Sequence, residues 1–119
     1  MRVRKLIHAA LLVTDLDRAQ QFYSRVVGLK EKARPDFDFP GTWYDLGECE
    51  LHLMVTSEPL PPADKRPRRD NHIAFHVDDL EAAKQALEEA GLEYRKSSSD
   101  QPSIFVRDPD GNLIELQER

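Results

Sequence analysis

The chain has 119 residues, of which 39% are hydrophobic and 33% charged, a composition typical of one folded globular domain. Its formal net charge of −5 argues against general nucleic-acid binding, which usually needs a basic face. No apolar run approaches the roughly 20 residues that a transmembrane helix needs, so we expect no membrane insertion. The single cysteine, Cys49, excludes an intrachain disulfide, and with no signal peptide we expect a cytoplasmic protein.

One segment of the chain is repeated. Residues 7–29, IHAALLVTDLDRAQQFYSRVVGL, resemble residues 71–92, NHIAFHVDDLEAAKQALEEAGL, and aligning His8 with His72 gives an offset of 64 residues through the first block. The offset is 63 at the glycine that closes each segment, so the first copy has one residue more. Repetition at a fixed spacing indicates a duplicated unit. We therefore expect one domain over 1–119, built from a first module, a linker and a second module: residues 1–56, 57–70 and 71–119.

The pattern of the first module predicts the order βαβββ. Apolar residues at 6–13 indicate a buried strand. Thr14 or Asp15 can cap the helix that follows, because a short side-chain oxygen accepts from free backbone amides. An apolar stripe at helical spacing and the closing Gly28 define this helix. We expect three further strands, at residues 29–33, 42–46 and 50–55.

The second module repeats this order. Asp78 or Asp79 is expected to cap its helix, and Gly91 to end it. The proline-rich segment before the module is interpreted as a solvated linker, although its basic run KRPRR, residues 65–69, could bind an anion. We expect the strands of this module at residues 71–77, 93–95, 103–107 and 112–117.

The first strand of each module carries histidine on one face. Side chains alternate along a strand, so His8 points away from its apolar neighbours, and His72 and His76 share one face. The helix of each module must cover the more apolar face of its sheet. The histidines are therefore expected on the opposite, open face, and two such modules side by side would form a curved sheet with a shared cleft.

The repeat pairs each first histidine with a second metal-capable residue. His52 follows His8 by 44 residues, and Glu115 follows His72 by 43. A carboxylate on an otherwise apolar strand is costly to bury without a partner, and a divalent cation would satisfy all four groups. Imidazole with carboxylate suits Ni, Zn, Fe or Mn rather than Ca or Mg. The sequence thus predicts a metal site of His8, His52, His72 and Glu115.

The segments that contain these residues resemble one family over the whole chain. They are His8 with VTDLDRAQQFYSRVVGL, His52 in ELHLM, HIAFHVDDLEAA, and DPDGNLIEL with Glu115. The chain resembles the vicinal oxygen chelate superfamily, also called glyoxalase/bleomycin resistance protein/extradiol dioxygenase. The resemblance implies an α+β fold of two tandem βαβββ modules in a curved mixed sheet with a metal-binding cleft. It also implies a homodimer, a small-molecule substrate chelated through two vicinal oxygens, and the four residues above as ligands.

Three activities are compatible with this resemblance. The preferred one is a metal-dependent lyase or isomerase of the glyoxalase type, with Glu115 and His76 as catalytic residues. Glutathione-dependent glyoxalases usually hold glutathione with an Arg and an Asn, and this chain has Leu12 and Thr56 at those positions. Fosfomycin-modifying relatives usually carry a Thr where this chain has Ala10. Neither specific substrate is therefore indicated.

The other two activities are an Fe(II) extradiol-type dioxygenase and a metal-free binding protein of the bleomycin-resistance kind. A dioxygenase of this type would use only three of the four ligands, with His52 as a spectator or a base. His76 is then a candidate base, and Tyr44 a candidate to reach the cleft. A binding protein generally lacks the ligands, so the intact set argues against it. His76 lies about 13 Å beyond His72 along the strand, too far for the same cation. It is either a rim residue or a substrate-binding or proton-transfer group.

Overall fold

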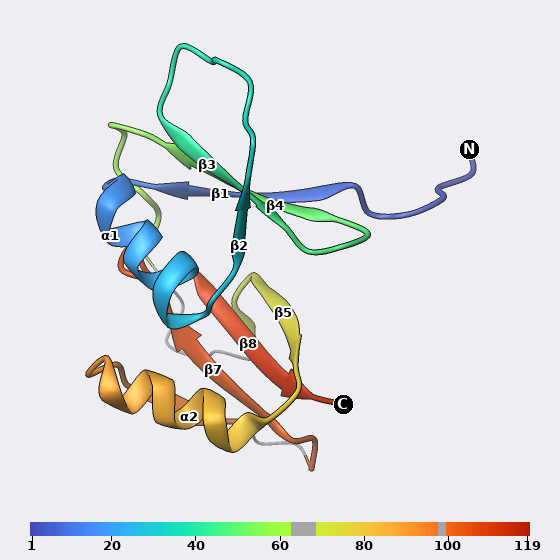
Figure 1. Ribbon diagram of the computed structural model, residues 1–119, viewed down its shortest axis with the longest axis vertical. Coiled ribbons are helices and arrows are strands. Elements are labelled where there is room, and N and C mark those ends of the chain that lie inside the picture. The colour runs from blue at the N-terminus through green and yellow to red at the C-terminus, as the bar shows by residue number, and fades with distance from the viewer. Residues whose placement is uncertain (63–68, 98–99) are drawn as a thin grey trace. The chain divides into compact units, whose positions relative to one another are not determined.

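The computed structural model describes residues 1–62, 69–97 and 100–119 (Figure 1). The chain divides into two compact units, Met1–Leu60 and Pro61–Arg119, and the boundary falls in the predicted linker. Both units have the expected order βαβββ, which confirms the α+β, two-module fold. Most of the basic run at 65–69 lies outside the described residues.

The described part of unit 1 forms a mixed four-stranded sheet with one helical segment. Its elements are β1 (His8–Val13), α1 (Leu16–Gln20), η1 (Gln21–Val26), β2 (Lys30–Lys32), β3 (Gly41–Asp45) and β4 (Glu50–Val55). The strand order is β1-β4-β3-β2, with β1 parallel to β4 and the other pairs antiparallel. The register sets Ala10 and Trp43 on either side of His52, which places His52 on an inner strand.

Unit 2 has the same topology over its described residues. Its elements are β5 (His72–Val77), α2 (Leu80–Glu89), β6 (Tyr94–Lys96), β7 (Ser103–Arg107) and β8 (Leu113–Glu118). The strand order is β5-β8-β7-β6, with β5 parallel to β8. Ala74 and Phe105 flank Glu115 in this register, so Glu115 takes the place in its sheet that His52 takes in the other.

The first helix contains the extra residue of the repeat as a π-helical segment. The segment 15–28 has one residue more than its counterpart 79–91. In η1, the Val27 amide donates to the Phe22 carbonyl at 2.9 Å, a bond across five residues instead of four. A π-helical turn takes up one additional residue without breaking the helix. The cap and the closing glycine therefore keep equivalent places in both units.

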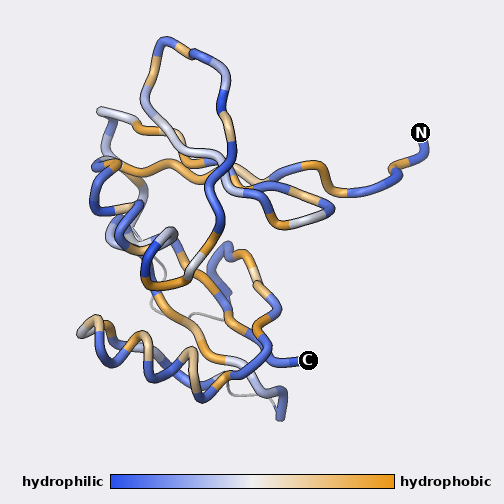
Figure 2. Tube along the Cα trace, in the orientation of Figure 1, coloured by the Kyte–Doolittle hydropathy of each residue, from blue (hydrophilic) through white to orange (hydrophobic). Residues whose placement is uncertain are grey.

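Each helix covers one face of its own sheet, as the apolar pattern predicts. Asp15 caps α1 by accepting from the Arg18 amide, and Asp79 caps α2 by accepting from the Ala82 amide, each at 3.1 Å. Hydrophobic and hydrophilic residues alternate along α2 as the helix turns (Figure 2). The most buried large side chains of the described residues include Tyr23, Tyr44, Leu51, Leu53, Leu87, Ile104 and Ile114. No described helix has the length and apolarity needed to cross a membrane.

Two side chains differ from the expectation. Ile7 lies outside β1 and is 68% exposed, and within β1 only Val13 is fully buried, so the expectation of a buried strand over the whole apolar run was wrong. Tyr44 is fully buried and its hydroxyl is 2.7 Å from the Ser24 hydroxyl, on the helix side of the sheet. Burial raises the pKa of the Tyr44 hydroxyl above its ordinary value. Tyr44 therefore does not lie on the open face where a dioxygenase would need it.

Candidate metal centre

His52 is packed between two other rings on the open face of unit 1. Its ring stacks on His8 with centroids 4.2 Å apart, and on Trp43 with centroids 4.0 Å apart and planes within 2°. His52 is only 9% exposed, whereas His8 is exposed. The structure thus brings together the first predicted pair of ligands, and Trp43 fixes the plane of the His52 ring.

The Glu50 carboxylate, which the sequence did not predict as part of the site, is hydrogen-bonded to the His52 ring. The Nε2 atom of His52 is 2.9 Å from the Glu50 carboxylate, which also pairs with the Lys32 ammonium. The bond to His52, and then Lys32, hold the pKa of Glu50 below its usual range. An ionised carboxylate only accepts, so Nε2 donates and Nδ1 of the neutral ring keeps its lone pair. The sequence could have predicted this contact, because Glu50 lies two residues before His52 and therefore shares its face of the strand.

In unit 2, His72 is oriented by a backbone carbonyl. Its Nδ1 atom is 2.9 Å from the carbonyl oxygen of Asp70, which can only accept, so Nδ1 donates and Nε2 of the neutral ring is left with the lone pair. Its ring also meets Phe105 edge to face at a centroid distance of 5.3 Å. Metal-binding histidines commonly donate their second nitrogen in this way. His72 therefore presents one defined donor atom.

Glu115 is half-buried on β8, on the same face of the sheet as His72. Its neighbours across the strands are Ala74 and Phe105, neither of which offers a polar side chain. Its carboxylate makes no hydrogen bond or ion pair with any residue that the structure describes. A carboxylate that is partly withdrawn from water and unpaired is well suited to bind a cation.

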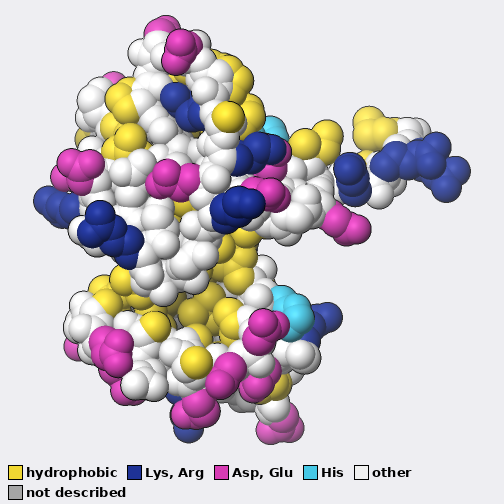
Figure 3. Space-filling view, viewed as in Figure 1, with side chains coloured by type: hydrophobic (Ala, Val, Ile, Leu, Met, Phe, Trp, Pro, Cys, Tyr) yellow, Lys and Arg dark blue, Asp and Glu magenta, His cyan; other side chains and the backbone are white. Residues whose placement is uncertain are grey.

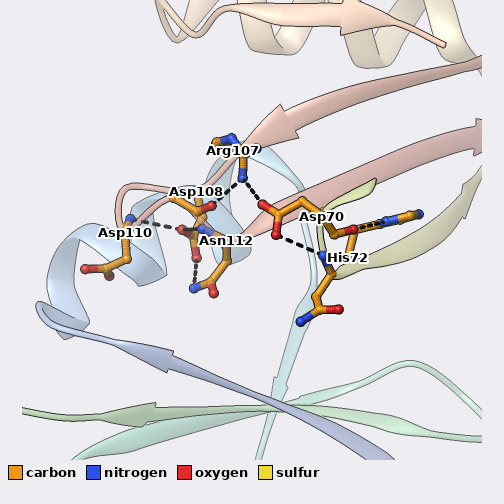
Figure 4. Close-up of polar contacts among 8 residues, drawn as sticks. Asp70, His72, Arg107, Asp108, Asp110 and Asn112 are labelled. Carbon is orange, nitrogen blue, oxygen red and sulfur yellow. Dashed lines mark hydrogen bonds and ion pairs between the residues drawn. The ribbon is translucent and has the colours of Figure 1, made fainter. Parts of the chain in front are cut away.

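A second network fixes the segment that leads into His72 (Figure 4). The Arg107 guanidinium donates to the Asp70 carboxylate and to the Gly111 carbonyl, both at 2.8 Å. The adjacent DPDG turn is closed by Asp108, which accepts from the amides of Asp110 and Asn112 at 2.9 and 2.8 Å. Arg107 therefore ties the turn before β8 to the residue whose carbonyl orients His72. No spacing rule in the sequence indicates this contact.

The two predicted pairs occupy equivalent places. Ala10 faces His52 across parallel strands as Ala74 faces Glu115. Among the described residues, no group of three His, Cys, Asp or Glu side chains is gathered as a metal site. Each pair alone offers two donors, fewer than the three or four protein ligands of a typical zinc or iron site. The donors themselves fit such a cation, since they are imidazole nitrogens and one unpaired carboxylate.

His76 lies on β5, on the same face as His72, and its side chain is exposed. Its partner across the parallel strands is Gln117, one step beyond Glu115 on that face. The structure therefore confirms the shared face.

The chain thus contains two tandem βαβββ units, each with a potential donor pair at equivalent positions. The sequence profile of the Glyoxalase/Bleomycin resistance protein/Dioxygenase superfamily matches residues 5–116, and the chain belongs to this superfamily.

Similar proteins carry several activities in their names. Glyoxylase I 4 of Arabidopsis thaliana is 30% identical over 98% of this chain and 71% of its own length. Glutathione transferase FosA of Serratia marcescens is 32% identical over 96% of this chain and 80% of its own. A glyoxalase-family protein of Bacillus anthracis superposes with a TM-score of 0.83 at 27% identity, over 100% of this chain and 98% of that one. These relatives establish the family and differ in their reactions.

Proposed function

We propose that this chain is a metal-dependent enzyme of the glyoxalase type, a lyase or isomerase that binds a small substrate through two vicinal oxygens. The observation that carries the proposal is the half-buried Glu115 carboxylate, which has no partner among the described residues and shares its face with the oriented His72. The names of the similar proteins, a glyoxylase I and a FosA transferase, agree with a small-molecule enzyme.

In this proposal, four side chains hold one divalent cation, Ni, Zn, Fe or Mn. The bound cation would act as a Lewis acid that stabilises negative charge developing on a substrate oxygen. Glu50 and the Asp70 carbonyl keep His52 and His72 in the orientations described above. The proposed ligands are His8, His52, His72 and Glu115.

Two residues are proposed to act on the substrate itself. Glu115 would lie beside the reacting atoms as the one anionic ligand. His76 would bind the substrate or move a proton, since an imidazole titrates near neutral pH. The substrate would be a small vicinal oxo or hydroxy compound, and the enzyme a cytoplasmic homodimer.

The test is reconstitution. Protein purified without a His tag is analysed for metal, stripped, reloaded with Ni, Zn, Mn or Fe(II), and assayed on small vicinal oxo and hydroxy compounds. We expect stoichiometric metal and turnover without oxygen uptake. Protein that takes up no metal, and binds small molecules without turnover, would instead be a sequestering protein.

The Fe(II) dioxygenase is the less supported alternative. Its tyrosine candidate, Tyr44, is fully buried on the helix side of the sheet and hydrogen-bonded to Ser24. Oxygen consumption with catechols after Fe(II) loading would restore this alternative.

A further inference from the structure

The open face of unit 1 carries an aromatic cluster beside His52. Trp43 stacks on His52, and Phe37 lies 6.1 Å from Trp43 at an angle of 45°. Phe39 stacks on Phe37 at 5.3 Å. Phe37 and Phe39 belong to the segment between β2 and β3, and Phe37 remains 46% exposed. The cluster therefore extends from a proposed metal ligand to an exposed phenyl ring.

A guanidinium is held within this cluster. The Arg34 side chain lies 4.8 Å from the centre of Phe37 and 5.0 Å from the centre of Phe39, and it donates to the Phe39 carbonyl at 2.7 Å. It also lies over Gly41, where an added Cβ would come within 3.1 Å of two of its nitrogens. Arg34 is therefore held in place before any ligand arrives.

Arg34 differs from the other cation next to the cluster. Lys32, the partner of Trp43 across the strands, is paired with Glu50. Arg34 pairs with no carboxylate in the described ranges 1–62, 69–97 and 100–119. Figure 3 shows hydrophobic, basic and acidic side chains over the loop between β2 and β3. A fixed cation beside exposed aromatic rings is complementary to a flat organic anion.

We propose that Arg34, Phe37 and Trp43 form a subsite for an aromatic or conjugated carboxylate next to His52. The guanidinium takes the carboxylate through two parallel hydrogen bonds, and the rings take the flat body. This inference rests on the proposed function, because it names the substrate class that the site selects. The binding itself needs no cation, so it can be tested apart from the metal.

The chain contains its own reporter for this test. Trp43 is the only tryptophan, so a ¹⁵N-labelled protein gives one indole N–H cross-peak, from the cluster itself. The metal-free protein in EDTA is titrated with benzoate and, separately, with the neutral isostere benzamide. Saturable movement of the Trp43 cross-peak with benzoate is expected, with benzamide binding about tenfold more weakly or worse, as expected on losing a charge-assisted hydrogen bond.

Three variants identify the residue responsible. Arg34→Gln should weaken benzoate about tenfold or more and leave benzamide unchanged. Arg34→Lys keeps the charge but loses the planar arrangement of donors, so its benzoate affinity should lie between those of the parent and Arg34→Gln. Lys30→Gln makes the same change of charge at an exposed position of β2, outside the aromatic cluster, and should bind benzoate as the parent does.

Several results would overturn the proposal. They are equal benzoate affinity in Arg34→Gln and the parent, equal affinity for benzoate and benzamide, and no saturable shift. A Trp43 cross-peak that moves with protein concentration instead would mean that a second copy covers this face. Zinc titration of Arg34→Gln separates the two proposals, since loss of benzoate binding with unchanged zinc affinity leaves the metal site intact.

Discussion

At the scale of single residues, His52 is the most constrained of the proposed ligands. Trp43 and His8 fix its ring plane, and Glu50 fixes the rotation of the ring within that plane. Glu50 is itself held by Lys32. A ligand restrained in this way loses little freedom when it binds a cation, so its partners contribute to metal affinity.

Replacing Glu50 with Ala should therefore weaken metal binding without removing a ligand. We expect nickel affinity to fall by roughly ten- to a hundredfold, as is typical for the loss of a carboxylate behind a metal-binding histidine. Isothermal titration calorimetry measures the change. Glu48→Ala, which removes an exposed carboxylate from the adjacent turn, is the matched control. Parent-like affinity in Glu50→Ala would mean that this hydrogen bond plays no part in the site.

His76 gives a prediction of a different kind. It shares the face of His72 but lies too far along β5 to reach the same cation. His76→Ala should keep the parent's metal content and lose most of its turnover on the substrate found by reconstitution. Gln117→Ala, its neighbour on β8, serves as a control for local disturbance. Normal kcat/KM in His76→Ala would mean that His76 neither binds the substrate nor transfers a proton.

Residue spacing predicted correctly which residues share a sheet face, and it predicted their surroundings poorly; their role as metal ligands stays a prediction. Two-residue alternation and the repeat together placed His8 with His52 on one open face, and His72 with Glu115 on the other. Spacing also placed Glu50 on the face of His52, although its role in holding His52 was missed. Arg34 and Arg107 act through long side chains that reach other segments, and no short-range pattern specifies such contacts. Tyr44 alternates with Trp43, the neighbour of His52 across the strands, so it lies on the opposite, helix-covered face; the sequence alone did not give this pairing.

At the scale of elements, the turn between β7 and β8 sets the position of Glu115. Asp108 is only 4% exposed, and its carboxylate accepts from the Asp110 amide and from both the amide and the side chain of Asn112. These bonds close the turn, from which β8 starts at Leu113.

Asp108→Ala should accordingly destabilise the fold by on the order of 3 kcal/mol, because it leaves several inward-facing amides without an acceptor. Urea unfolding followed by circular dichroism measures the loss. Asp100→Ala, at an exposed position of the preceding loop, should stay within about 0.5 kcal/mol of the parent. Equal stability of the two variants would show that the turn does not depend on Asp108.

The elements were predictable to within a residue or two at most ends. Helix caps at Asp15 and Asp79 and the closing glycines follow from local chemistry, which acts over a few residues. The extra residue in the first helix was visible from the repeat. Its accommodation as η1 was not, because the choice between a π-helical turn and a loop depends on packing against the sheet.

At the scale of the whole molecule, duplication gives each unit two donors of a kind that metals bind. Among the described residues, no three His, Cys, Asp or Glu side chains are arranged as a metal site. The proposed site therefore combines both pairs, from one chain or from two. For a chain with exposed open-face side chains on both first strands, we expect a homodimer.

Light scattering tests this assembly. We expect the mass of two chains of 13.7 kDa at micromolar concentration. A single-chain mass over the same range would contradict the homodimer, and metal stoichiometry would then apply to the monomer.

The metal site itself is tested most directly by removing its one anionic ligand. Metal-free parent, Glu115→Ala and Glu118→Ala are each titrated with zinc and with nickel in a calorimeter. Glu118 is on the same strand, three residues further along, so its variant makes the same change of charge outside the proposed ligand set. We predict that the parent and Glu118→Ala bind one cation tightly per site, and that Glu115→Ala does not. Unchanged affinity in Glu115→Ala would contradict the four-residue site.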